Sequence, residues 1–368
     1  MKTYDIGIIG AGPGGIACAL QAQKHGLSFF IIEKGSRIFQ GIIDSYPKGK
    51  KVYATIPKSE TGPFPIEALA PAPNKPPVEE YIDTIEALAA ERGIAVQFNQ
   101  DFESMRKDRD AFVVATGSGH YRARAVVLAF GSNIPVDLGV YGEAKTIARR
   151  LDNVQDHIGF STLVIGGGNA AADVVAALSR AKRDADDETP VYWSNRMEHF
   201  EINTDVARDL GEEILLGGHI RILQGALPRI GEVDEDGVDR LTILTQEIDA
   251  GCGVILKQAM SFPMKHVIAC IGTQGPAPIF TQIGLQQITC TEGVCRIGKE
   301  GAQLVILSPD FQTSIKGIYA IGGAVSPAYI EIQEEGSFKE RKHTNLIYTA
   351  VKDAVRAVDH IAARLSQK

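Results

Sequence analysis

Residues suited to nucleotide chemistry lie in two distant segments of the chain. In the first, YDIGIIGAGPGGIACAL, the residues Gly10, Gly12 and Gly15 have G-x-G-x-x-G spacing between an apolar strand-like run and a helical pattern. The first glycine allows a tight bend, the second lets the backbone approach a pyrophosphate, and the third lets helix and strand pack closely. The free amides at the start of the helix then favour phosphate. The pattern predicts a dinucleotide site.

The second segment, STLVIGGGNAAADVVAAL, has the same type of glycine turn. Gly166 and Gly168 occupy the first two positions and Ala171 the third, a substitution that such turns tolerate. Two turns in one chain predict two dinucleotides with electrons passing between them.

The strand after each turn indicates which nucleotide binds. Glu33 ends the strand expected over 29–33, where a carboxylate can accept hydrogen bonds from ribose hydroxyls. The corresponding strand of the second segment ends in Ser194, Asn195 and Arg196, with no acidic residue. Arg196 could pair with a 2′-phosphate, which favours NADP(H) over NAD(H). The alternative is that Arg196 is an ordinary solvated arginine.

Composition excludes several classes of protein. The net charge of −7 argues against nucleic acid as a partner, and no apolar run approaches the length of a membrane span. No targeting segment precedes the first strand, so we expect a cytoplasmic protein. The eight histidines and five cysteines are scattered without metal-ligand spacing, and no C-x-x-C occurs. We therefore expect no metal site.

Alternating strand and helix patterns predict an α/β fold with largely parallel sheets. The Pro-rich stretch 57–77 is expected to be a loop, and turn signals at 234–237 and 250–253 predict β-hairpins. The last helix is expected over 344–365, with Thr344 or Asn345 as its N-cap. The other expected elements are strands at 4–9, 111–116, 126–130, 191–196, 267–272 and 317–323, and helices at 15–26 and 78–92.

Three further segments resemble those of a known family. VVLAFGSNIP (126–135) and VIACIGT (267–273) are similar to the "ATG" strand turns of flavoprotein reductases that bind two dinucleotides, and GIYAIGG (317–323) is similar to their flavin-contacting motif. Over nearly its whole length the chain resembles the thioredoxin-reductase-like branch of the pyridine nucleotide-disulfide oxidoreductases. The resemblance implies two Rossmann-like (three-layer β/β/α) nucleotide-binding domains, the second inserted in the first. An FAD domain would comprise 1–133 and 266–368, and an NAD(P)H domain 134–265, with hinges near 133–139 and 264–266.

The resemblance also implies the residues that hold the cofactors. The last helix would direct its positive end at the flavin pyrimidine ring. The residues implied for FAD are Gly10, Gly12, Pro13, Gly14, Gly15, Glu33, Lys34, Gly131, Gly322 and Gly323. The residues implied for the nicotinamide cofactor are Gly166, Gly168, Asn169, Ala170 and Arg196.

The chain departs from the family pattern at three places. The C-x-x-C ahead of the second turn is absent, so the usual relay from flavin to a protein dithiol cannot operate. Gly323 stands where the family usually has an aspartate for a ribityl hydroxyl. The segment 324–343 is longer and more charged than the family's, and Lys339, Arg341, Lys342 or His343 would either line the flavin's substrate face or be solvated.

Other thiols offer a substitute for the missing dithiol. Cys290 and Cys295 could form a hairpin disulfide, whereas Cys18, on the first helix, is expected to pack in the core. The flavin itself would do the chemistry, and the candidate catalytic side chains are Cys290, Cys295 and His343.

The sequence thus predicts an FAD-dependent NAD(P)H oxidoreductase that passes a hydride from NADPH to the flavin and then serves an external acceptor. The acceptor would be a ferredoxin-like protein, a quinone, a free flavin or a small disulfide, and the enzyme is expected to be a homodimer. One alternative is an enzyme with an altered second nucleotide site. An alternative of another class is a flavin- or dinucleotide-bound redox sensor without turnover.

Overall fold

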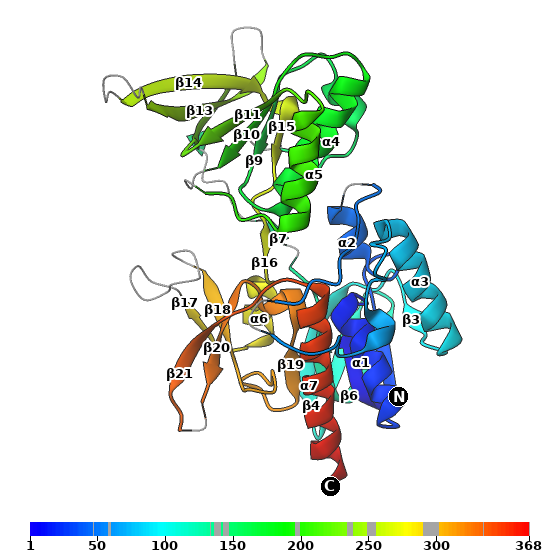
Figure 1. Ribbon diagram of the computed structural model, residues 1–368. Helices are drawn as coiled ribbons and strands as arrows, with labels where there is room; N and C mark the ends of the chain where they lie inside the picture. Colours follow the sequence, from blue (N-terminus) through cyan, green and yellow to red (C-terminus); the bar gives the residue numbers. More distant parts are fainter. Residues whose placement is uncertain are drawn as a thin grey trace. The chain divides into compact units, whose positions relative to one another are not determined.

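The chain forms two compact units. Unit 1 comprises Met1–Asp44, Lys51–Ile134 and Thr273–Lys368, and unit 2 comprises Ser45–Lys50 and Pro135–Gly272. The structure is a computed structural model (Figure 1), and it describes residues 1–46, 48–57, 60–132, 134–135, 141–142, 147–195, 199–233, 238–248, 255–289, 302–333 and 335–367.

Unit 1 is built on a mixed sheet with the order β3-β2-β1-β6-β5-β4, in which β19 also pairs with β6. β1, β2, β3, β6 and β19 run parallel, while β4 and β5 continue the sheet antiparallel. These strands are β1 (Thr3–Ile9), β2 (Phe29–Ile32), β3 (Val96–Gln97), β4 (Phe102–Asp108), β5 (Ala111–Thr116), β6 (Gly119–Leu128) and β19 (Ile318–Ala320).

Two helices of unit 1 come from opposite ends of the chain and pack side by side: α1 (Pro13–Lys24) and α7 (Ile347–Ser366) (Figure 1). Across this contact the Asp359 carboxylate accepts a hydrogen bond from Gln21 Nε2 at 2.5 Å and lies 2.6 Å from His25 Nε2. The predicted N-cap of the last helix is wrong. The cap is Leu346, because the Thr349 hydroxyl accepts the Leu346 N–H and completes the first turn there.

The remaining helices of unit 1 are short or amphipathic. α3 packs one apolar face inward through Tyr81, Ile82 and Ile85, as its spacing predicts. The Pro-rich stretch contains the 3₁₀ turn Glu67–Leu69, whose Leu69 carbonyl accepts a hydrogen bond from the buried Tyr81 hydroxyl. The helices are α2 (Gln40–Ser45), α3 (Val78–Glu91) and α6 (Ala277–Ile283).

A second sheet of unit 1 has the order β17-β18-β20-β21. The charged segment 324–343 therefore forms a hairpin in which Ile332 pairs with Phe338 and Ala328 with Lys342. The strands are β17 (Gln287–Thr289), β18 (Gln303–Leu307), β20 (Ala328–Ile332) and β21 (Phe338–Lys342).

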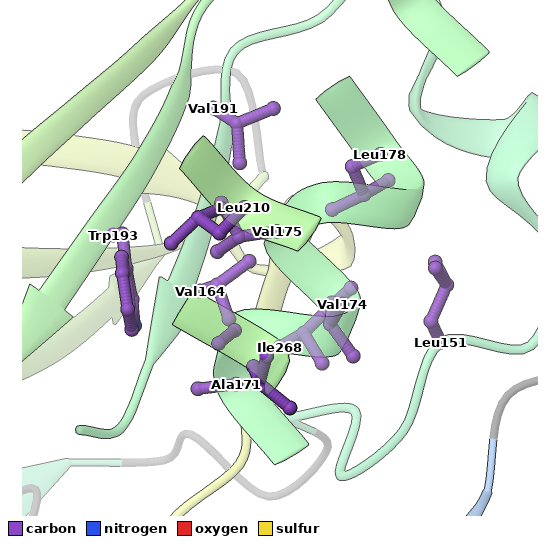
Figure 2. Close-up of a cluster of buried hydrophobic side chains, with 12 residues drawn as sticks. Leu151, Val164, Ala171, Val174, Val175, Leu178, Val191, Trp193, Leu210 and Ile268 are labelled. Carbon is purple, nitrogen blue, oxygen red and sulfur yellow. The ribbon is translucent and has the colours of Figure 1, made fainter. Parts of the chain in front are cut away.

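Unit 2 contains a parallel sheet with the order β11-β10-β9-β15. Its side chains meet those of α4 (Asn169–Asp184) and α5 (Thr204–Leu215) in an apolar core around Val164, Trp193 and Leu210 (Figure 2). The strands are β9 (Thr162–Ile165), β10 (Val191–Asn195), β11 (Ile220–Gln224) and β15 (Val267–Ala269).

A second sheet completes unit 2, with the order β14-β13-β12-β8, in which β14, β13 and β12 pair antiparallel and β8 pairs with β12 in parallel. The predicted turns at 234–237 and 250–253 lie outside the described residues. The two strands that flank each predicted turn pair with each other antiparallel, as the strands of a hairpin do. The strands are β8 (Tyr141–Gly142), β12 (Leu227–Val233), β13 (Asp239–Ile248) and β14 (Ile255–Pro263).

The second predicted domain boundary, after residue 265, differs from the division between the units. β15 pairs in parallel with β9, and the Cys270 N–H donates to the Ile165 carbonyl at 2.7 Å. Residues 266–272 therefore belong to unit 2, and the predicted hinge at 264–266 is the 3₁₀ turn Met264–His266 inside that unit.

In the part of the chain that the structure describes, we find no helix with the length and apolar character that a membrane crossing requires.

Candidate functional site

The first glycine turn joins β1 to α1. Gly10 has φ +103°, and a side chain on Gly10 or Gly15 would collide with the backbone of Ala129 or Gly10, respectively. Gly12 differs, since it has an ordinary extended backbone with φ −73° and a Cβ built there meets no atom within 4 Å. The fold thus requires glycine at the outer two positions, whereas at Gly12 glycine leaves open space beside the start of α1.

Helix α1 begins without a side-chain cap in the part of the chain that the structure describes. Gly12 is the N-cap. Pro13 occupies the first position, where its missing N–H costs no hydrogen bond. Amides without a side-chain cap and the positive end of the helix dipole suit a phosphate group, so the turn fits the pyrophosphate of a dinucleotide.

Glu33 lies against this turn. Its side chain follows β2, is 8% exposed, and accepts the Ala11 N–H at 2.7 Å and the Gly35 N–H at 2.8 Å. Each carboxylate oxygen retains a second lone pair. Glu33 is therefore fixed by the backbone with acceptor capacity left for ribose hydroxyls, while Lys34 beside it is exposed.

Three neighbouring parallel strands end together near this turn. β1, β6 and β19 are followed by Gly10, Gly131 and Gly322, all with positive φ, so the three glycines lie at one edge of the sheet. Gly14 also faces this edge, because a Cβ there would lie 3.1 Å from Ile321 Cδ1.

Gly323 stands in a tightly filled place. A Cβ on this residue would lie 2.7 Å from the Ser132 backbone nitrogen and 3.0 Å from Asn345 Oδ1. Asn345 in turn donates to the Ser132 hydroxyl at 2.7 Å. A carboxylate-bearing side chain does not fit at position 323 without displacing the backbone, which gives a physical reason for the glycine.

The second turn, between β9 and α4, repeats the arrangement of the first. Gly166 has φ +137°, and a side chain there would collide with the Cys270 carbonyl. Gly168 differs, since it is the N-cap of α4 with φ −104° and a Cβ built there meets no atom within 4 Å. Within the described residues no side chain caps α4 either. Ala171, in the third position, is fully buried. The second turn therefore also fits a pyrophosphate.

Polar residues around the second turn hold its shape. Asn169 Oδ1 accepts the Asn203 N–H at 2.8 Å, while Ala170 is exposed. Asn195 is 6% exposed, packs on Gly167 and donates to the His199 carbonyl at 2.6 Å. Arg196, predicted to read a 2′-phosphate, lies outside the described residues.

His343 is placed differently from the expectation that it lines a substrate face. Its Nδ1 lies 2.6 Å from the Ser326 hydroxyl and its Nε2 lies 2.9 Å from Asp353 Oδ2, and all three side chains are buried. Asp353 Oδ2 also accepts the Gly322 N–H at 2.9 Å. Both ring nitrogens thus take part in a buried hydrogen-bonded chain of side chains that holds the Gly322 turn. Of the other charged candidates, Lys339 and Lys342 are exposed and Arg341 pairs with Glu331 at 2.6 Å.

Sequence reasoning missed Ser326 and Asp353, because their contacts with His343 follow no motif or periodicity.

Two of the five cysteines lie in the described chain. Cys18 is buried in α1, as expected, and Cys270 follows β15. Burial raises the pKa of the Cys18 thiol, and the nearby Asp353 raises it further. Burial likewise raises the pKa of Cys270 to about 12. Neither is a thiolate at neutral pH. Cys290 and Cys295 lie outside the described residues, as does Cys252.

The two turns and the parallel sheets define a class of protein, and residues 7–212 match the family model described as pyridine nucleotide-disulphide oxidoreductase. The chain belongs to this family. The predicted α/β fold with nucleotide-binding units is confirmed, and so are the predicted enzyme class, an FAD-dependent NAD(P)H oxidoreductase, and its cofactors FAD and NADP(H).

Individual relatives align with most of the length of the chain. A ferredoxin–NADP reductase of Rickettsia typhi is 23% identical over 99% of this chain and 94% of that protein, and one of Streptococcus equi subsp. zooepidemicus is 25% identical over 88% and 86%. Among solved structures, the bacillithiol disulfide reductase of Staphylococcus aureus aligns over 99% of both chains with a TM-score of 0.73 and 17% identity. Thioredoxin reductase of T. acidophilum covers 100% of both chains, with a TM-score of 0.65 and 16% identity. At these identities the structures show a shared fold.

Proposed function

We propose that this chain carries electrons from NADPH through FAD to a small redox protein of the ferredoxin type. The observation that supports it most is the pair Gly12 and Gly168. At both N-caps the fold has no need of glycine, yet glycine keeps the space beside an uncapped helix start open. Bound FAD would supply the chemistry, since a flavin accepts a hydride and passes electrons on singly.

In this proposal unit 1 is the FAD domain and unit 2 the NADP(H) domain. The amides at the start of α1 bind the FAD pyrophosphate, and Glu33 orients the adenosine ribose. Asp353 and His343 hold the Gly322 turn at the same sheet edge. In unit 2 the start of α4 binds the pyrophosphate of NADP(H), and Asn169 fixes the turn through Asn203.

The acceptor is inferred from two observations. Curated relatives that align along nearly the whole chain are named ferredoxin–NADP reductase. In addition, the sequence has no C-x-x-C and the two described cysteines are protonated at neutral pH. An acceptor that takes electrons directly from the flavin, without a protein dithiol, fits both.

An anaerobic titration tests the proposal. The purified, FAD-loaded protein is titrated with NADPH and separately with NADH while the visible flavin band is followed. We expect bleaching by stoichiometric NADPH. Ferredoxin, a quinone, free flavin and cystine are then offered in turn, and we expect ferredoxin to reoxidise the flavin fastest.

Other outcomes identify the alternatives. A yellow protein that neither nucleotide bleaches would favour the redox sensor or the altered second site. Fast reoxidation by cystine, abolished by replacing Cys290 and Cys295 with Ser, would favour the hairpin disulfide.

The nucleotide preference has its own test. Replacing Arg196 with Ala is expected to weaken the binding of NADPH by roughly 10- to 100-fold, the contribution of one or two charge-assisted hydrogen bonds, and to leave the binding of NADH unchanged. The apparent Kd of each nucleotide comes from the flavin titration. Equal losses for both nucleotides would mean that Arg196 does not contact the 2′-phosphate.

A further inference from the structure

Three buried polar side chains of unit 1 lie together beside the Gly322 turn. Ser326 and His343 are each 7% exposed, and Asp353 is 4% exposed. They come from three elements: Ser326 ends the 3₁₀ turn Gly322–Val325, His343 follows β21, and Asp353 lies in α7. The side chains hold the turn, but a carboxylate and an imidazole also bring charge to a place where an apolar contact would have been enough.

Asp353 connects these side chains to the turn. Its Oδ2 atom accepts the Gly322 N–H at 2.9 Å and lies 2.9 Å from His343 Nε2. The turn packs closely on the same helix, because a Cβ built on Gly322 would lie 3.1 Å from Ala350 Cβ in α7. The carboxylate is therefore fixed against the backbone of a residue that is proposed to contact FAD.

Other ionisable groups sense the charge of Asp353. Burial, followed by Asp353, raises the pKa of the Cys18 thiol on α1. Burial, followed by Glu331 and Asp353, raises the pKa of Tyr329 on β20 to about 12. Both effects show that the field of this carboxylate extends to neighbouring elements. A carboxylate as deeply buried as Asp353 is costly unless a cation balances it.

His343 is positioned to balance that charge. The His343 and Asp353 side chains are 5% and 6% exposed, and the imidazole Nε2 faces the carboxylate. The other ring nitrogen, Nδ1, lies 2.6 Å from the Ser326 hydroxyl, whose oxygen can accept a hydrogen bond. The His343 backbone N–H donates to the Pro327 carbonyl at 2.7 Å, which fixes the residue further. Each ring nitrogen thus faces an acceptor, so the place suits an imidazolium.

Charges beside the Gly322 turn matter for a flavin because a hydride adds one negative charge to the ring system. Fixed charges near a cofactor tune its electronic properties. A carboxylate opposes the added charge and lowers the redox potential, whereas an imidazolium favours the added charge and raises the potential.

We propose that Asp353 sets the redox potential of the bound flavin, lowering it through its negative charge, and that His343 is the counter-ion that limits this effect. The inference rests on the proposed function, because it requires FAD at the Gly322 turn. Both residues are positioning residues that act through the turn and its charge, and they determine how readily the flavin takes electrons from NADPH.

Asp353→Asn separates the position of the turn from the charge beside it, because the amide oxygen can still accept the Gly322 N–H. FAD affinity is measured on the apoprotein by flavin fluorescence. The potential is measured by anaerobic equilibration of the FAD-loaded protein with a reference dye. We expect FAD affinity within about threefold of the wild type, and a ratio of reduced to oxidised flavin that rises roughly tenfold at a given dye potential.

Three further variants complete the test. His343→Gln keeps a donor for Asp353 and an acceptor for Ser326 without a charge, so the ratio of reduced to oxidised flavin should fall by roughly three- to tenfold. Asp353→Leu removes the acceptor of the Gly322 N–H and should weaken FAD binding by at least about tenfold. The control, Asp359→Asn, removes the same charge about 9 Å further along α7, where the side chain is 49% exposed, and should change neither quantity.

An unchanged or lower flavin ratio in a yellow Asp353→Asn protein would overturn the proposal. An unchanged ratio in His343→Gln would overturn the counter-ion role, and this variant tests the charge independently if Asp353→Asn does not fold. A wild-type protein that binds no FAD would instead contradict the proposed function, so the two failures can be told apart.

Discussion

Glycines of the two nucleotide turns serve two distinct purposes. At Gly10, Gly15 and Gly166 the backbone itself leaves no room for a Cβ, so a substitution disturbs the fold. At Gly12 and Gly168 the fold leaves room, so a substitution disturbs whatever occupies that room. The two kinds of position can therefore be separated by mutation.

Gly12→Val and Gly168→Val should each remove one nucleotide and spare the other. In Gly12→Val we expect FAD affinity to fall by at least about 100-fold, because the side chain occupies the pyrophosphate position. Gly168→Val should remain yellow but resist bleaching by NADPH. FAD content and the anaerobic titration measure both effects. A yellow, FAD-replete Gly12→Val protein would refute the first assignment.

Gly323→Asp restores the residue that the family pattern leads one to expect, yet it should weaken FAD binding. Its Cβ would lie 2.7 Å from the Ser132 nitrogen, so the backbone must move to admit it. We expect a loss of roughly 10- to 100-fold in FAD affinity, equivalent to about 1–3 kcal/mol of overpacking. Fluorescence of released flavin gives the Kd. Tighter binding than in the wild-type protein would contradict the account of this position.

The elements at the amino end of the unit 2 sheet contain buried groups that respond to acid. Burial lowers the pKa of both His157 and His266 below the ordinary value. A histidine with a lowered folded pKa gives stability that is complete above the unfolded pKa and is lost as the pH falls below it. For His266 the window runs from about 6.5, the unfolded value, down to about 4.

We therefore expect unit 2 to lose up to about 2 kcal/mol of stability through His266 between pH 6.5 and 5, and His157 to add to the loss in the same direction. Trp193 is the one tryptophan of the chain and is 2% exposed in unit 2, so its fluorescence during urea unfolding reports on that unit. His266→Phe should lose part of the pH dependence, and His157 should retain the rest. His219→Phe, at an exposed position, is the control. If the free energy of unfolding changes with pH by the same amount in the wild type and in His266→Phe, His266 does not contribute to the pH dependence.

Sequence patterns locate these elements well and their partners less well. The strand predicted at 267–272 exists as β15, but its apolar run does not reveal that it pairs with β9 rather than with the unit 1 sheet. Helix α1 starts at Pro13 rather than Gly15, because Gly12 already acts as the cap. The glycine turns and Glu33 are local patterns and could be read directly. The Ser326–His343–Asp353 chain and the stacking of the Phe160 ring on His266 arise from tertiary contacts that leave no periodic trace.

Taken as a whole, the molecule offers no described thiol suited to redox exchange, and this bears on the route of the electrons. A variant in which Cys18 and Cys270 become Ala and the other three cysteines become Ser should keep NADPH-dependent ferredoxin turnover within about twofold, since no thiolate takes part. Treatment of the NADPH-reduced wild type with N-ethylmaleimide is the independent check. A large fall in turnover in either experiment would show that a cysteine carries electrons.

The side-by-side packing of α1 and α7 has a consequence for synthesis on the ribosome. The β1–α1 turn emerges long before α7, the helix that packs on α1. Unit 2 is complete once Gly272 has emerged, so it can fold before the C-terminal part of unit 1 has been translated. At about 5–20 residues per second, translation of that part takes roughly 5–20 seconds. During this time the apolar face of α1 lacks its native cover, and a nascent chain that terminates early leaves it without α7.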